Sequence, residues 1–206
     1  MMKIKLFCLL VLATVFIAPK DADAILLTFE DLTLDRVYNV GDSFSTNSVT
    51  VQVQQFYPMI DVQLSGNAKV DNFGKAGATG LEPTLNNVNL KFLLNYSGPS
   101  SVFAFMFADQ GDDICLGING VVERAANFTS LPGTIGGANV YVAGGYPFGI
   151  IMITGSFIVN LTIGGQNLSI DNVLVYQGDI PEPATIVLLG LGGLGLLVKK
   201  RRDGPC

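Results

Sequence analysis

The hexapeptide Val102-Phe103-Ala104-Phe105-Met106-Phe107 (VFAFMF, residues 102–107) decides the fold class of this 206-residue chain. Successive side chains of a β-strand point to opposite faces of the sheet. The three phenylalanines would therefore share one face, and Val102, Ala104 and Met106 the other. A strand that is apolar on both faces predicts a position at the centre of a sheet.

Apolar and polar residues alternate with a period of two on both sides of this hexapeptide, and no stretch between residues 25 and 180 shows a helical stripe. Alternation predicts strands at 49–53, 88–92 and 157–163, and further strands near 26–29, 114–118, 140–142, 150–153 and 173–176. Clusters of Gly, Asn, Asp and Pro separate them. Nine or ten short strands at this spacing predict an all-β fold, an antiparallel β-sandwich with the jelly roll as its expected topology.

The charge of residues 25–180 limits the classes of partner. This segment has 13 acidic and 5 basic side chains, a net charge of −8. Such a surface repels nucleic acid and anionic lipid, so no nucleic-acid partner is expected, and divalent cations or neutral polymers fit better. The chain contains no histidine, which excludes Ser-His-Asp and Cys-His catalysis and imidazole zinc sites. Paired carboxylates would suffice for a glycosidase, but the Glu-x-Asp-x-Glu strand motif is absent, and we expect no enzyme activity.

The first 24 residues have the pattern of a secretory signal peptide. Lys3 and Lys5 precede an apolar run from Leu6 to Ala18, and Ala22-Asp23-Ala24 has the small-x-small pattern of a cleavage site. We expect cleavage after Ala24, with an uncleaved anchor as the alternative. Export would then place residues 25–178, a single domain, outside the cytoplasm.

Three parts follow one another in the segment Ile180–Arg202, IPEPATIVLLGLGGLGLLVKKRR. A helix cannot run through Pro181-Glu182-Pro183. Residues 184–198 are uncharged and predominantly apolar. They predict a short transmembrane helix of roughly 22 Å, against a hydrocarbon core of ~30 Å. The cations Lys199, Lys200, Arg201 and Arg202 form a stop-transfer signal that would keep the C-terminus in the cytoplasm. A buried core helix is the alternative.

This segment resembles the PEP-CTERM protein-sorting signal. The resemblance rests on Pro181-Glu182-Pro183, Ala184, Thr185, the Leu/Gly run and Arg201-Arg202. The extra tail Asp203–Cys206 lies beyond the pattern, and the segment with its basic tail spans residues 179–206. The resemblance implies processing by exosortase. It also implies a transient inner-membrane anchor and sorting to the surface or matrix of a Gram-negative bacterium that makes extracellular polysaccharide.

The domain before the signal also has a resemblance, carried by LTFEDL (27–32), NNVNLKF (86–92), LGING (116–120) and LSIDNVLV (168–175). These motifs are similar to those of β-sandwich ectodomains that precede PEP-CTERM and other anchors. This resemblance implies a non-catalytic structural role at the cell surface or in a biofilm matrix. The alternative is a carbohydrate- or calcium-binding module.

Three carboxylates are the candidate ligands for a structural calcium ion. Glu30 and Asp31 follow the first expected strand, and Asp171 lies near the last. Because the first and last strands of a sandwich often lie side by side, these oxygens would converge on one cation. The alternative is that the aspartates form turns and Glu30 is solvated. The loop Asp109–Asp113 is the second candidate, with a solvated turn as its alternative.

Two further features bear on binding and redox chemistry. Tyr57-Pro58 and Tyr146-Pro147-Phe148 are expected in loops, where their rings would either bind sugar or pack over the core.

Cys115 would be the only cysteine left after removal of the targeting segments, which contain Cys8 and Cys206. An intramolecular disulfide is then impossible. The alternation predicts that Cys115 faces away from the inner core, where it would be covered and inert or would form an intermolecular disulfide.

Overall fold

The computed structural model describes residues 23–56, 65–76, 80–94, 100–111 and 113–177. All of them fall in one compact unit, Asp23–Gly178. Within these described ranges no helix is long and apolar enough to cross a membrane. The expected span 184–198 and the signal peptide before Asp23 lie outside them. The expected cleavage position after Ala24 falls inside the first strand.

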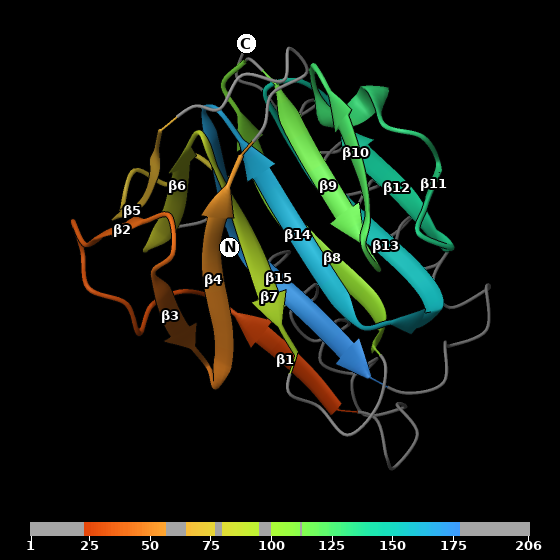
Figure 1. Ribbon diagram of the computed structural model, residues 1–206, viewed down its shortest axis with the longest axis horizontal. Coiled ribbons are helices and arrows are strands. Elements are labelled where there is room, and N and C mark those ends of the chain that lie inside the picture. The colour runs from red at the N-terminus through yellow and green to blue at the C-terminus, as the bar shows by residue number, and fades with distance from the viewer. Residues whose placement is uncertain (1–22, 57–64, 77–79, 95–99, 112, 178–206) are drawn as a thin grey trace, which may run out of the picture. The chain divides into compact units, whose positions relative to one another are not determined.

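The described residues form two antiparallel sheets that face each other (Figure 1). Sheet A has nine strands in the order β11-β12-β13-β8-β15-β6-β5-β2, with β1 also paired to β15, and sheet B has six in the order β10-β9-β14-β7-β4-β3. The elements are β1 Asp23–Leu27, β2 Val37–Asn39, β3 Ser43–Thr46, β4 Val49–Gln55, β5 Asn67–Asp71, β6 Glu82–Asn86, β7 Val88–Leu93, β8 Ser100–Asp109, β9 Ile114–Ile118, β10 Val121–Ala125, the 3-10 turn Phe128–Ser130, β11 Thr134–Ile135, β12 Ala138–Gly144, β13 Phe148–Ile158, β14 Asn160–Gly165 and β15 Leu168–Gln177.

The pairing of the strands is that of a jelly roll. Four antiparallel pairs are nested along the chain, β9 with β10, β8 with β13, β7 with β14 and β6 with β15. Successive pairs alternate between sheets B and A. This is the connectivity of one long hairpin rolled into two sheets. The predicted all-β sandwich and its jelly-roll topology are therefore confirmed.

The core lies between the inner faces of the two sheets. Phe103, Phe105 and Phe107 of β8 are almost fully buried there. Phe128 of the 3-10 turn packs against two of them, with ring centroids 5.9 Å from Phe105 and 4.6 Å from Phe107. Strand β8 pairs with β13 on one side and β15 on the other, as its two apolar faces predicted.

Two sequence-based expectations about strands need correction. The stretch 157–163 was expected as one strand, but β13 ends at Ile158 and β14 begins at Asn160 in the other sheet. At the crossing, the Val159 amide donates to Asn119 Oδ1, 3.0 Å away, and Val159 is exposed. The described residues contain fifteen strands rather than nine or ten. The extra ones, such as β5 and β6, are short and polar and carry a weak periodicity signal.

Candidate functional site

The last strand, β15, changes its neighbour near Asp171. Its first residues, Leu168 and Ser169, pair with β6, whereas residues 173–177 pair with β1. The register against β8 shifts between Asp171 and Leu174, and Asn172 adopts a φ of +50°. Asparagine tolerates this left-handed conformation better than most residues. The irregularity lies where carboxylates from several strands and loops gather.

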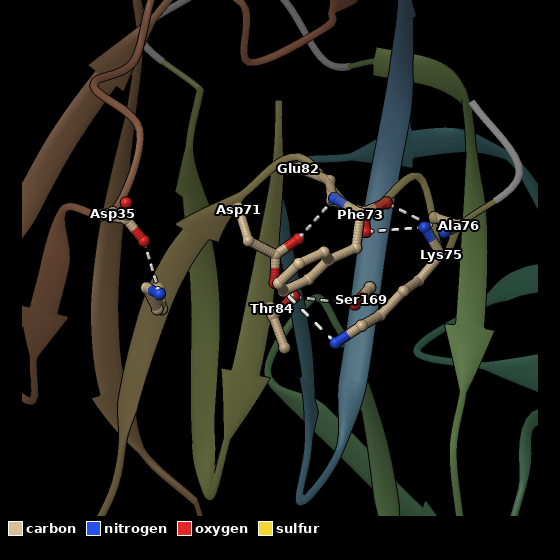
Figure 2. Close-up of polar contacts among 9 residues, drawn as sticks. Asp35, Asp71, Phe73, Lys75, Ala76, Glu82, Thr84 and Ser169 are labelled. Carbon is tan, nitrogen blue, oxygen red and sulfur yellow. Dashed lines mark hydrogen bonds and ion pairs between the residues drawn. The ribbon is translucent and has the colours of Figure 1, made fainter. Parts of the chain in front are cut away.

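Glu82, on β6, is the most deeply buried of these carboxylates and organises the loop that precedes its own strand. Its Oε1 accepts a hydrogen bond from the Lys75 amide at 2.8 Å, and its Oε2 accepts one from the Ala76 amide at 2.9 Å (Figure 2). Burial raises the pKa of Glu82, the two amides lower it, and the neighbouring Asp71 raises it; the pKa stays above its ordinary value. The carboxylate therefore fixes the β5–β6 connection.

Asp71 begins a hydrogen-bonded chain across three strands of sheet A. Its Oδ2 accepts from Thr84 Oγ1 at 2.6 Å, and Thr84 Oγ1 lies 2.9 Å from Ser169 Oγ (Figure 2). Because the single Thr84 hydroxyl proton is donated to Asp71, Ser169 must donate to Thr84. Lys75 Nζ lies 3.8 Å from Asp71 Oδ2. The chain joins β5, β6 and β15, elements far apart in sequence.

Asp171 is buried at the irregularity of β15, with 3% of its surface exposed. It accepts a hydrogen bond from its neighbour's amide, Asn172 N, at 2.6 Å and a second from Asn172 Nδ2 at 3.2 Å. Burial raises the pKa of Asp171 to about 6, with smaller contributions in the same direction from the charges of Glu82 and Glu30. Ionised carboxylates therefore repel one another at this position.

The three residues expected to bind calcium have separate partners. Glu30 Oε1 accepts from the Leu81 amide at 3.0 Å. Asp31 instead accepts from Thr46 Oγ1 at 2.7 Å and from the Asn47 amide at 2.9 Å. Burial alone would raise the pKa of Asp31, but these hydrogen bonds hold it below its ordinary value. The charge of Glu30 contributes to the raised pKa of Asp171, whereas Asp31 ties the chain after β1 to the end of β3.

Metal-ligating side chains do not form a cluster in the part of the chain that the structure describes: no group of three or more His, Cys, Asp or Glu there is arranged to hold an ion. In the second candidate loop, Asp109 Oδ1 accepts from the Gly111 amide at 3.1 Å. The Asp113 amide donates to Gln166 Oε1 at 3.0 Å. Asp112 lies outside the described residues. Calcium binding stays a prediction.

Exposed rings are found at two loops. Tyr146 and Phe148, which the sequence singled out, are 62% and 55% exposed; Tyr57 lies outside the described residues. Phe73 was missed: it is 69% exposed, and Lys75 Nζ lies 5.1 Å from its ring centroid. Its position directly after β5 could have been found only by recognising the polar strand β5.

Cys115 lies on β9 and faces away from the inner core, as predicted, yet it is buried. Its Sγ donates to Asn89 Oδ1 at 3.0 Å. Burial raises the pKa of the thiol to about 12, against a smaller opposing effect of Arg124. Because the thiolate is the reactive form, this geometry favours the covered and inert cysteine over an intermolecular disulfide.

Sequence reasoning also missed Asp71, Glu82, Thr84 and Ser169. For Asp71, Glu82 and Thr84 the signal was the presence of charged residues within the weakly periodic stretches 67–71 and 82–86; nothing in the sequence pointed to Ser169. The expected sorting residues, Pro181-Glu182-Pro183 and Lys199–Arg202, lie outside the described residues, as does Ala22 of the expected cleavage site.

In a comparison with protein families, residues 179–202 match the PEP-CTERM protein-sorting motif. The search of curated proteins and the search of solved structures found no match to this chain. The matched segment begins two residues after β15 ends at Gln177. The motif implies export, processing by exosortase and a C-terminal membrane-anchor region. The chain is therefore an all-β domain followed by a C-terminal segment that matches the PEP-CTERM protein-sorting motif, which supports an exported protein.

Proposed function

We infer that the jelly-roll domain is a non-catalytic structural component of the bacterial surface or of its extracellular polysaccharide matrix. The observation that carries this proposal is the order of the parts. A folded β-domain ends at Gln177, and the sorting motif begins at residue 179. The domain is thus the cargo that the motif delivers.

The use made of the buried carboxylates supports a structural role. A glycosidase needs two carboxyl groups that face a substrate. Here Glu82 accepts hydrogen bonds from two loop amides, Asp71 accepts one from Thr84, and Asp171 accepts from Asn172. Each of these groups holds the backbone or a neighbouring strand of its own domain.

Deletion and complementation of the gene in a bacterium that has exosortase test this proposal. We expect deletion of the gene to weaken the cohesion of the matrix. Re-expression of the wild-type chain should restore this cohesion, and the chain should be found in the matrix fraction. The variant Asp171→Asn should restore it equally well, because a structural role needs the fold and not the acid. Full cohesion without the protein would contradict the structural role. Restoration by wild type but not by a folded and correctly sorted Asp171→Asn chain would point to chemistry at Asp171.

A second candidate function is polysaccharide binding at the β12–β13 turn. Tyr146 and Phe148 are exposed there, two residues apart, and aromatic rings pack against the apolar faces of sugars. Affinity electrophoresis of the full chain in gels that contain the host polysaccharide should show retardation, which Tyr146→Ala should reduce. Phe157→Ala is the matched control, because Phe157 is 61% exposed elsewhere on β13. Equal migration with and without polysaccharide would contradict this function.

We also propose that the domain binds calcium, because the charges of Glu82 and Glu30 disfavour the ionised form of Asp171 and a cation would remove that repulsion. Binding to the native state alone stabilises it by roughly 2.7 kcal/mol at a hundredfold excess over Kd. Thermal melts of the full chain in chelator and in millimolar calcium should then differ by several degrees, and Asp171→Ala should abolish the difference. Identical wild-type melts would exclude a stabilising site.

A further inference from the structure

The outer faces of the two sheets differ in chemistry. On sheet B, the register places Ser43, Gln52, Lys91 and Thr162 side by side across β3, β4, β7 and β14. This is the polar outer face expected of an antiparallel sheet with one side in water. These four strands of sheet B thus give an internal reference for a solvated face of this domain; the same row ends beyond them at the exposed Val122 of β10.

The outer face of sheet A carries an apolar row instead. The register aligns its five members across β12, β13, β8, β15 and β1: Tyr141, Met152, Ala104, Leu174 and Leu26. Neighbouring strands lie ~4.8 Å apart, so the row is roughly 19 Å wide. We call these five residues, with their outer-face neighbours Val102, Met106 and Ile150, the apolar face.

The fold does not need this face to be apolar. The same strands already fill the core with their opposite side chains, such as Phe105, Ile151 and Val175, which are almost fully buried. Yet Leu26, Tyr141 and Ile150 are 47%, 52% and 42% exposed. The apolar face thus exposes large side chains at both of its ends, on β12 and β1, and on β13. Exposed contiguous apolar patches on a monomer are often binding sites.

The charges of the domain limit which class of partner could bind to the apolar face. None of the apolar-face residues is charged. One acidic side chain, the buried Asp171 of β15, pairs with Met106 at the edge of this face. A net charge of −8 over residues 25–180 opposes docking onto an anionic lipid surface. A polysaccharide would leave its hydroxyl groups unpaired against such a face. A second copy carries the same net charge, but the residues of the apolar face that would meet in a pair are themselves uncharged.

The sorting motif supplies a reason why two copies would meet. Residues 178–183 connect β15 to the apolar anchor segment that begins at residue 184. Six extended residues reach at most about 20 Å. Anchored copies would therefore be confined to a thin layer with their C-termini toward the same membrane, which raises their effective concentration. We propose that the apolar face of sheet A is the interface through which two copies of this chain pair while they are anchored.

Cysteine cross-linking in membranes tests the pairing. The full chain, with Cys8→Ser and Cys206→Ser, receives one cysteine on the apolar face, Ala104→Cys or Leu174→Cys, and a short bis-maleimide is added to the membrane fraction. The matched controls are Gln52→Cys and Thr162→Cys on the outer face of sheet B. We expect a cross-linked dimer from the sheet A variants and roughly tenfold less from the controls. Equal yields from the two sheets, or monomers alone, would overturn the proposal.

A charge placed in the interface gives the second arm of the test. Tyr141→Lys in the Ala104→Cys chain should lower the yield of dimer roughly tenfold, because an unpaired lysine would be buried. Gln52→Lys should leave the yield unchanged, and protease resistance would show that each variant is folded. An adduct of Ala104→Cys with a different protein, or protection of Ala104→Cys by lipid alone, would also overturn pairing between copies. The proposed matrix role would stand in either case.

Discussion

Asp171, at the irregularity of β15, makes the stability of the fold depend on pH. Its pKa in the folded chain is about 6, above the ordinary value of 3.8, and the main cause is burial. A carboxyl whose pKa is raised by folding stabilises the fold fully below its unfolded pKa, and this contribution is lost as pH rises through the folded pKa. The loss therefore falls between pH 3.8 and somewhat above 6.

Asp171→Asn should remove this pH dependence, because the amide stays neutral. We expect the variant to be more stable than wild type by about 1–3 kcal/mol near pH 8 and similar to it near pH 4. Urea unfolding of both chains at the two pH values measures the difference. A residual slope is expected, since the pKa of Glu82 is raised as well. The same change in stability at both pH values would contradict the role given to Asp171.

Gly80 is required by its backbone and by its neighbour. Its φ is +115°, and an added Cβ would collide with the carboxylate of Glu30. We expect Gly80→Ala to destabilise the domain by about 1–3 kcal/mol. Gly41→Ala is the matched control, since Gly41 has a φ of +96° with open space around the site of its Cβ. Thermal melts should show a larger loss at Gly80. Equal losses would mean that backbone strain alone accounts for both.

At the scale of elements, the hydrogen-bonded chain from Asp71 through Thr84 to Ser169 fixes the order β5-β6-β15. Thr84→Val keeps the shape of the side chain but removes both of its hydrogen bonds, so a buried Asp71 oxygen and the Ser169 hydroxyl lose a partner. We expect a loss of about 1–3 kcal/mol. The double variant Thr84→Val/Ser169→Ala should cost less than the sum of the single variants, which a double-mutant cycle measures. Strict additivity would show that the hydroxyl groups are not coupled.

Strands were predictable where burial is strong and regular. The expected strand 114–118 coincides with β9, and 88–92 lies within β7. Strands β5 and β6 were missed because each is five residues long and has only two inward apolar residues. Asp71 and Glu82 lie at positions where alternation predicts polar, exposed side chains, yet they are buried. The carboxylate network could not be predicted, since Thr84 and Ser169 meet across 85 residues of sequence. Only the register of β6 against β15 brings them together.

At the scale of the whole molecule, features that depend on local sequence could be predicted, whereas features that depend on contacts between distant residues could not. The spacing of short strands predicted a jelly roll, and the Pro-Glu-Pro, apolar and cationic order predicted the sorting motif that the family comparison matches. The expected calcium ligands show the limit. Glu30, Asp31 and Asp171 were grouped because terminal strands often adjoin, and β1 does pair with β15. The direction of the Asp31 side chain toward Thr46 depends on β3, which the sequence did not reveal.

The central claim is that the C-terminal motif sorts the folded domain. Replacing Pro181-Glu182-Pro183 by three alanines, in a bacterium with exosortase, tests it most directly. Replacement of Asp203-Gly204-Pro205, which lies beyond the matched residues, is the control. Immunoblots of membrane and extracellular fractions should show the wild-type and control chains released and shortened, and the Pro-Glu-Pro variant retained in the membrane at full length. Release of all three chains in equal amount and at equal size would contradict the claim.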